Sequence, residues 1–177
     1  NRMTKFGRLF GDQTTARIDL SRPVDFDISA LAQSGDDVVA AVLATTWTSA
    51  FAAKNAADML AEEGLQPRRN HVIIMDEMHR ALRASPLMVE KLDLLTRLNR
   101  QWGVGQIMIT HTFKDLMCME TPAQNTKARG FVERSEIKVL GALSRIEVDR
   151  YLRGECGLPV SRREEDMLED WATPVNF

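Results

Sequence analysis

The sequence predicts an α/β fold in which a mostly parallel sheet is flanked by helices and followed by a small helical C-terminal end. Two short apolar runs, residues 72–75 and 107–109, are bounded by polar residues and Gly, as buried strands are. Segments of helix length precede and separate these runs, an order typical of parallel sheets with helical crossovers. The 177 residues, 44% of them hydrophobic, suffice for one well-buried core. We expect a single domain, with the sheet core over about residues 1–142 and the helical end over residues 143–177.

The first half of the chain predicts a strand, a long helix and a second strand. Residues 24–29 alternate apolar and polar side chains, as a strand does. A helix is expected to begin at Asp36, to run to about Glu63 and to be ended by Gly64. The uninterrupted apolar run at residues 72–75 predicts a strand that is buried on both faces.

A further helix and strand are expected next. Ser85 followed by Pro86 marks a helix start, with Ser as the cap and Pro at the first position. This helix is expected to run through Asn99, and its apolar stripe consists of Leu87, Leu92, Leu95 and Leu98. Gly103 and Gly105 then turn the chain into the strand at residues 107–109.

Beyond residue 115 the pattern is less regular. It predicts a strand at residues 136–140, a helix at residues 144–153 and another helix from Ser161. Ser161 and Glu164 have the spacing of a capping box. Three basic residues could face a translocated strand, but their alternation with acids predicts a surface loop: Lys127, Arg129 and Arg134.

The composition excludes several classes of protein. Apolar residues are plentiful while Gly and Pro are few, which excludes a disordered or collagen-like chain. A net charge of −2 and a pI of about 6.0 argue against a surface that binds nucleic-acid phosphates throughout, and leave a local basic strip open. The charge-free run at residues 38–53 is shorter than the ~20 residues a bilayer requires, which predicts a buried helix. Cys118 and Cys156 lack the spacing of a zinc site or a disulfide framework, which favours a reducing, intracellular compartment.

Two adjacent carboxylates, Asp76 and Glu77, directly follow the first apolar run. The second run ends in Thr110, His111 and Thr112, so neighbouring strands would bring acids, hydroxyls and an imidazole to one edge of the sheet. In nucleotide hydrolysis, one carboxylate of such a pair holds Mg²⁺ and its neighbour orients or deprotonates the attacking water. The alternative is a strand that simply ends in two solvated acids.

The stretch VIIMDE, the Arg-bearing helix end TRLNR and the strand that ends in ITHT resemble the later half of a P-loop ATPase motor domain. The resemblance is to the HerA/FtsK superfamily, and within it to the conjugative-transfer and type IV secretion ATPases. It implies a RecA-like sheet and hydrolysis of ATP with Mg²⁺. It also makes VIIMDE the Walker B motif, in which Asp76 organises Mg²⁺ through water and Glu77 activates the attacking water. His111, with Thr110, then takes the place of the polar residue, commonly Gln, that senses the γ-phosphate.

The same resemblance implies partners and a location. Members of this superfamily act as ring-shaped, hexameric homo-oligomers at a secretion or conjugation membrane complex, where they drive transfer of DNA or protein. We therefore expect a cytoplasmic protein that lies peripherally at the inner face of the cell membrane. Arg97 and Arg100 lie near a helix end, where they either complement the helix dipole or act as arginine fingers toward a neighbouring subunit's nucleotide.

The phosphate-binding loop of such ATPases, GxxxxGK[ST], does not occur in this sequence. That loop supplies the backbone N–H groups and the Lys that hold the phosphates, and the hydroxyl that binds Mg²⁺. We therefore expect the chain alone to bind ATP poorly. The sequence begins at Asn1 and has the character of the C-terminal portion of a longer motor domain, with the loop expected upstream.

Two alternatives stay open. The stretch DEMH at residues 76–79 also spells the DExH box of helicase superfamily 2, and residues 110–112 lie near the position of the Ser/Thr-x-Thr motif in those enzymes. The chain after residue 112 is short for the second RecA-like domain of such a helicase. The other alternative is a non-catalytic docking or assembly module. Within DEMH, His79 has three interpretations: a coupling residue of the DExH type, a metal ligand beside Asp76 or, most simply, a polar residue on the first turn after the strand.

Overall fold

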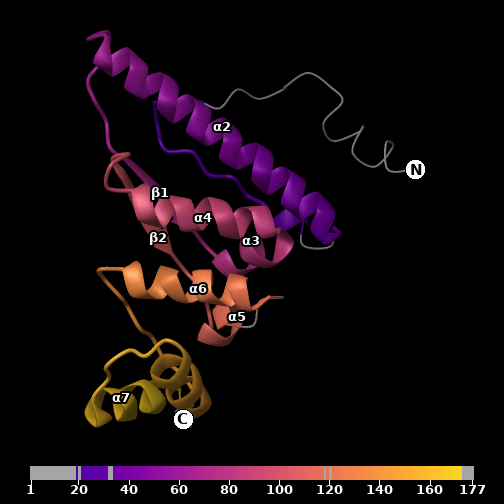
Figure 1. Ribbon diagram of the computed structural model, residues 1–177, viewed down its shortest axis with the longest axis vertical. Coiled ribbons are helices and arrows are strands. Elements are labelled where there is room, and N and C mark those ends of the chain that lie inside the picture. Colours follow the sequence, from indigo (N-terminus) through magenta and orange to yellow (C-terminus); the bar gives the residue numbers. More distant parts are fainter. Residues whose placement is uncertain (1–18, 20, 32–33, 118, 120, 173–177) are drawn as a thin grey trace, which may run out of the picture. The chain divides into compact units, whose positions relative to one another are not determined.

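The computed structural model describes residues 19, 21–31, 34–117, 119 and 121–172 (Figure 1). The chain divides into two compact units, residues 1–71 and residues 72–177. The first unit contains a short 3₁₀ helix and one long α-helix, and the second contains nearly all of the sheet and the remaining helices. The sheet of the second unit positions the candidate site.

The first unit contains η1 (Ser29–Leu31) and α2 (Asp36–Glu62). α2 matches the predicted helix, and the helix ends as expected at Gly64, whose φ of +73° a glycine adopts without steric cost. The N–H of Leu65 then donates to the carbonyl of Leu60 at 2.9 Å, as in a Schellman motif. Within the described part of the chain, no helix combines the length and the apolar character needed to cross a membrane.

Two expectations for this unit are wrong. Residues 24–29 form no strand, because the Asp27 carboxylate accepts the N–H of Ser29 at 2.8 Å in a local turn that competes with extended backbone. The run at residues 38–53 is helical but is not buried throughout, since Thr45 and Thr48 are exposed. Their hydroxyls donate to backbone carbonyls one turn earlier, each at 2.8 Å, and so satisfy their polar groups within the helix.

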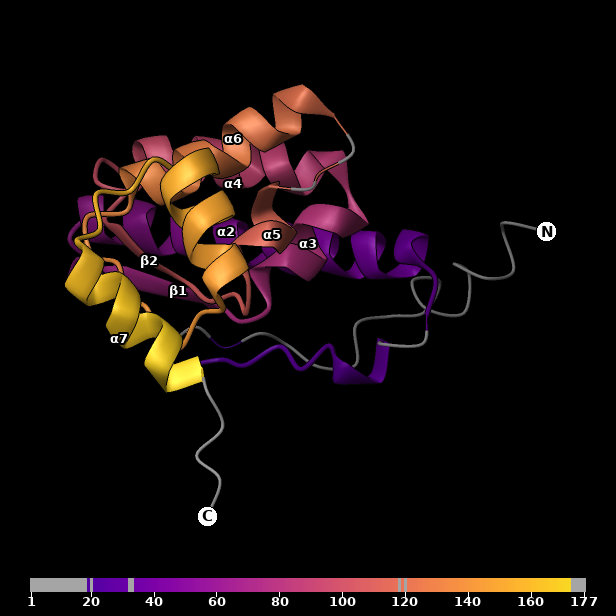
Figure 2. The same cartoon turned by 90° about the horizontal axis from the view of Figure 1, so that it is seen from below.

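The second unit is built on a two-stranded parallel sheet formed by β1 (His71–Met75) and β2 (Val104–Met108). The two strands are connected by α3 (Met78–Ala84) and α4 (Pro86–Leu98), seen from a second direction in Figure 2. This is the strand, helix and strand order expected from the sequence. The α/β class is therefore confirmed, with a sheet of two strands in the described residues.

The two faces of this sheet differ in exposure, which corrects the expectation that its strands are buried on both faces. Val72 and Ile74 are 64% and 63% exposed, and Ile107 on the neighbouring strand and Ile109 directly after it are also exposed. The residues between them, such as Ile73, are half-buried, because successive side chains of a strand point to opposite faces. An uninterrupted apolar run thus indicates a strand, but it does not reveal how many of its faces are covered.

α4 begins at the predicted residue, but one residue of its predicted apolar stripe is not buried. The hydroxyl of Ser85 accepts the N–H of Leu87 at 3.2 Å, and Pro86 occupies the first helical position. Leu92 and Leu95 are fully buried as expected, whereas Leu87 is exposed. Leu87 precedes Leu92 by five positions, which places it about 140° away around the helix. The buried residue one turn before Leu92 is instead Met88.

α5 (Phe113–Met117) and α6 (Pro122–Arg134) follow β2. α6 replaces the predicted surface loop, because its start carries a complete capping box. The Thr121 hydroxyl accepts the N–H of Gln124 at 3.3 Å, and the Gln124 side chain accepts the N–H of Thr121 at 3.1 Å. The sequence prediction followed the alternating charges and missed the apolar face of this helix, which is buried at Phe131 and its neighbours.

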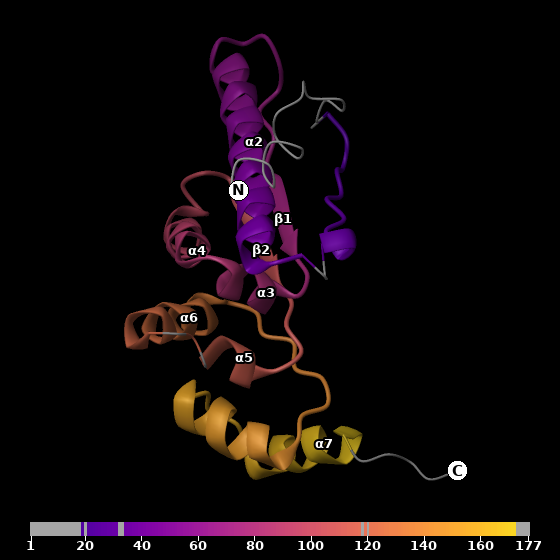
Figure 3. The same cartoon turned by 90° about the vertical axis from the view of Figure 1, so that its right-hand side faces the viewer.

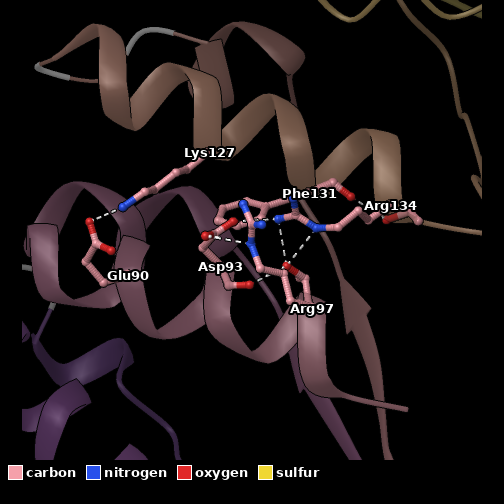
Figure 4. Close-up of polar contacts among 8 residues, drawn as sticks. Glu90, Asp93, Arg97, Lys127, Phe131 and Arg134 are labelled. Atoms are coloured by element: carbon pink, nitrogen blue, oxygen red, sulfur yellow. Dashed lines mark hydrogen bonds and ion pairs between the residues drawn. The ribbon is translucent and has the colours of Figure 1, made fainter. Parts of the chain in front are cut away.

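A buried carboxylate joins α4 to α6 (Figure 4). Asp93 accepts hydrogen bonds from Nη2 of Arg134 at 2.7 Å and from Nε of Arg97 at 3.0 Å. Arg134 also donates to the hydroxyl of Thr96, at 2.8 Å from Nη2 and 3.1 Å from Nε. We call these four residues the Asp93 cluster. A Cβ atom on Gly130 would lie 2.6 Å from Nη1 of Arg134, so the glycine leaves room for the guanidinium.

The C-terminal part consists of η2 (Glu147–Glu155), which has π-helical hydrogen bonding, and α7 (Arg162–Ala172) (Figure 3). Their contact is a small apolar cluster that contains Leu143, Val148, Leu152 and Leu168. The expected helices at this end are therefore present, although the first is a π-helix from Glu147 onward. The Ser161 capping box is confirmed, since the N–H of Ser161 donates to Glu164 at 2.7 Å. This bond, together with the Ser161 hydroxyl, lowers the pKa of Glu164.

The strand expected at residues 136–140 is not formed. Ile137 and Val139 alternate with polar residues as predicted, but they are 84% and 91% exposed and belong to an irregular connection between α6 and η2. Strand-like alternation needs a neighbouring strand to pair with. In the described part of the chain this segment has no such neighbour.

We expect the Asp93 cluster to stabilise the second unit more than the exposed ion pair beside it. Asp93→Ala should lower the free energy of unfolding by about 2–3 kcal/mol, because two charge-assisted hydrogen bonds to a buried carboxylate are lost. Glu90→Ala is the matched control: it removes an exposed carboxylate, which pairs with Lys127 across the same two helices, and should cost less than about 1 kcal/mol. Urea unfolding followed by circular dichroism measures both, and equal losses would contradict the assignment.

Gly130→Ala should have opposite effects in two backgrounds. Alanine normally stabilises a helix interior by about 1 kcal/mol relative to glycine. Here the new methyl group displaces Arg134 from Asp93, so we expect the free energy of unfolding to fall. In an Arg134→Ala background the same substitution should raise it. A stabilisation of equal size in both backgrounds would show that the glycine is not needed for the Asp93 cluster.

The thiol of Cys156 should be unreactive in the folded protein. Cys156 is buried, and burial raises its pKa to about 11, so only about 0.1% is thiolate at pH 8. Cys118, the second cysteine of the sequence, lies outside the described residues. In a Cys118→Ser variant, we expect a disulfide reagent at pH 8 to react at least about 100-fold more slowly with the folded protein than with the unfolded protein in guanidinium. Similar rates in the two states would show that Cys156 is accessible and ionised normally.

Candidate functional site

The ends of β1 and β2 are tied together by their backbones. The N–H of Ile109 donates to the carbonyl of Met75 at 2.9 Å, and the carbonyl of Ile109 accepts the N–H of Met78 at 3.0 Å. These two bonds bracket Asp76 and Glu77 and bring them to the edge where the segment after β2 begins. The structure therefore places the acid pair beside residues 110–112, as the strand order predicted.

Glu77 has an unusual backbone conformation. Its φ of 50° and ψ of 44° lie in the left-handed region, and among the described residues it is the one non-glycine residue with a positive φ. Such a conformation costs roughly 1–3 kcal/mol and persists only where surrounding contacts enforce it. The bonds from Met78 to Ile109 and from the N–H of Arg80 to the carbonyl of Glu77, at 2.8 Å, enforce it here.

The carboxylate of Glu77 lies between two imidazoles. Its Oε1 is in close contact with Nε2 of His111, which follows β2. Its Oε2 lies 3.2 Å from Nδ1 of His79, which is on the first turn of α3. Nδ1 of His79 is buried and makes no hydrogen bond in the described part of the chain, although this carboxylate oxygen lies near it. The side chains of Glu77, His79 and His111 are 30%, 14% and 73% exposed.

Asp76 lies in a different environment from Glu77. It is exposed, and its Oδ1 accepts the N–H of Glu77 at 2.9 Å. No group of three or more His, Cys, Asp or Glu residues in the described ranges is arranged to hold a metal ion. A site with one carboxylate fits Mg²⁺, which retains several waters and takes further oxygens from phosphates, better than a metal that needs a cage of protein ligands.

Thr110 and Thr112 bond mainly to their own segment. The Thr110 hydroxyl donates to the carbonyl of Thr112 at 3.4 Å, and the Thr112 hydroxyl accepts the N–H of Asp115 at the start of α5. Thr112 therefore acts as a helix cap. The sensing role expected for Thr110 stays a prediction.

The two arginines near the end of α4, Arg97 and Arg100, have bonding partners other than Asp76 and Glu77. Arg97 is held by Asp93, in the cluster between α4 and α6. Arg100 is exposed beyond the helix, and its N–H donates to the side chain of Asn99 at 2.6 Å. For Arg97 this ion pair is a structural contact that was not predicted from the sequence, and the finger role stays a prediction for both residues.

The contribution of His79 was not visible in the sequence. The DEMH spelling places His79 two residues after Glu77, but only the left-handed conformation of Glu77 brings that carboxylate near its ring. This conformation depends on a hydrogen bond to Ile109, more than thirty residues away in sequence.

Comparison with known proteins gives one informative likeness. No protein-family model matches the sequence, and no curated protein matches it. The solved structure of VirB4 of Thermoanaerobacter pseudethanolicus is similar over 82% of this chain, with a TM-score of 0.59 and 19% sequence identity. The chain spans 35% of that protein's length. The predicted resemblance to the conjugative-transfer and type IV secretion ATPases is therefore confirmed at the level of the fold alone.

Proposed function

We propose that this chain is part of an ATP-hydrolysing motor that resembles those powering conjugative DNA transfer and type IV secretion. The observation that carries the proposal is the meeting of Glu77 and His111 at the carboxyl edge of β1 and β2, beside Asp76, in a chain with the fold of VirB4. Phosphate-bearing ligands of open α/β sheets bind at this edge.

The proposed roles follow from the two acids' surroundings. Asp76, exposed at the strand end, would hold Mg²⁺ through water; the ion would neutralise charge that develops on the phosphates. Glu77 would take one proton from the attacking water, as the water oxygen bonds to the γ-phosphorus and ADP leaves with the bridging oxygen. His111 is largely exposed and lies on Glu77, where it would report on the γ-phosphate.

The remaining parts of such a motor would come from outside these residues. We propose that a phosphate-binding loop upstream of Asn1 completes the site, since GxxxxGK[ST] does not occur in the sequence. The larger RecA-like sheet, the hexameric ring, the cytoplasmic location at the inner face of a membrane complex and the DNA or protein substrate are parts of the same proposal. They are supported by the likeness in fold to VirB4.

A second candidate function is a docking or assembly module. It is favoured by the exposed apolar face of the sheet at Val72, Ile74, Ile107 and Ile109, which is the kind of surface that partners cover. The superfamily 2 helicase alternative assigns the same work to Asp76 and Glu77, and the likeness to VirB4 favours the secretion motor over it.

Substitution of Glu77 tests the motor directly. In the polypeptide that carries this chain together with its phosphate-binding loop, Glu77→Gln should lower ATP turnover by about 10²-fold or more, because the general base is removed. ATP binding should be retained. Glu90→Gln, an exposed carboxylate on α4, is the matched control and should leave turnover unchanged. Turnover by Glu77→Gln at the normal rate would exclude this role and favour the docking module.

A further inference from the structure

We propose that His79 is a positioning residue for Glu77 and that it acts as the fixed half of a two-imidazole clamp. The carboxylate clamp consists of Glu77, His79 and His111. Nδ1 of His79 lies 3.2 Å from Oε2, while Oε1 meets His111 beyond the end of β2. The consequence for hydrolysis rests on the proposed function, whereas the clamp itself can be tested without nucleotide.

The two imidazoles differ in their freedom to move. The side chain of His79 is 14% exposed, and its Nδ1 is shielded from water with no hydrogen-bond partner in the described part of the chain. A buried imidazole nitrogen without a partner is unfavourable, so His79 is driven to keep the Glu77 carboxylate near it. His111 is 73% exposed, so its ring can leave Glu77 for solvent or a ligand at little cost.

The backbone fixes the spacing on the His79 side. Glu77 and His79 belong to one turn, which is closed by the bond from Arg80 to the Glu77 carbonyl and anchored by the bond from Met78 to Ile109. The strained φ of Glu77 is part of this turn, and strain of this kind concentrates at functional sites. His111, by contrast, lies on the separate segment after β2 and meets Glu77 through its side chain.

This asymmetry gives each histidine a different task. With both imidazoles in place, each carboxylate oxygen of Glu77 has an imidazole nitrogen beside it, so fewer of its acceptor sites are open to a water molecule. When His111 moves away, Oε1 becomes more accessible and keeps its direction, because the buried ring of His79 still lies beside Oε2. His111 thus limits the access of water to Oε1 until it is displaced, and His79 keeps the carboxylate in its orientation when His111 leaves.

Nuclear magnetic resonance of the histidine rings tests the clamp in the 177-residue chain. The sequence contains three histidines, and His71 serves as the internal reference. Glu77→Gln should shift the ring signals of His79 and His111 and leave those of His71 in place. His79→Gln should shift the His111 signals in the same direction as Glu77→Gln, because the carboxylate is no longer aimed at His111.

A conservative pair of variants separates positioning from a general loss of structure. The side-chain amide nitrogen of Asn can occupy the place of the imidazole Nδ1, whereas that of Gln lies one bond farther out. His79→Asn should therefore keep the His111 signals near those of the unsubstituted protein. His79→Gln should shift them even though its circular dichroism and unfolding midpoint match those of His79→Asn. His111 signals that stay in place in His79→Gln would overturn the proposal.

Kinetics distinguish failure of the clamp from failure of the proposed function. In the polypeptide that includes the phosphate-binding loop, His79→Gln should lower kcat by about tenfold or more with an unchanged KM for ATP, and His79→Asn should restore most of it. If Glu77→Gln leaves turnover unchanged, the motor is excluded while the resonance shifts still test the clamp. If Glu77→Gln abolishes turnover but His79→Gln does not change kcat, the positioning role is overturned alone.

Discussion

The candidate site depends on the backbone of one residue, Ile109. Its N–H bonds to the end of β1 and its carbonyl bonds to the start of α3, so the two residues between them, Asp76 and Glu77, are confined to a tight turn at the sheet edge. That confinement forces Glu77 into the left-handed region. It also brings the Glu77 carboxylate to His111, only two residues beyond Ile109. The position of the acid pair beside His111 therefore depends on how β2 and the residue after it pair with β1.

Local signals in the sequence predicted much of the fold. Ser85 with Pro86, Gly64, and Ser161 with Glu164 each satisfied backbone groups at the helix end where they were expected. Predictions that required knowledge of a neighbour were less successful. Residues 136–140 alternate like a strand but find no partner strand in the described residues, and the Asp27 turn replaces a strand at residues 24–29. Alternation describes what a segment is able to do, whereas pairing depends on the rest of the sheet.

In the candidate site, too, features set by local sequence were predictable, whereas features set by contacts with distant residues were not. The acid pair and His111 were predictable because apolar runs locate strand ends and parallel strands share an edge. His79 was not, because its relation to Glu77 is created by a hydrogen bond to a distant residue and by a backbone conformation that Glu rarely adopts. Arg97 shows the converse case: its position near a helix end was correctly recognised, but its partner, Asp93, becomes evident only with α6 packed against α4.

The placement of charge on α6 bears on where a motor of this kind would meet a nucleic acid. The sequence left a local basic strip open, and Lys127, Arg129 and Arg134 were its candidates. Each of the three has a carboxylate partner: Glu90, Glu133 and Asp93, respectively. A cation that is already paired gives little net attraction to a phosphate, because the interaction must first replace an existing one. If DNA is the transported substrate, contacts through α6 would have to replace these three ion pairs with contacts to phosphates.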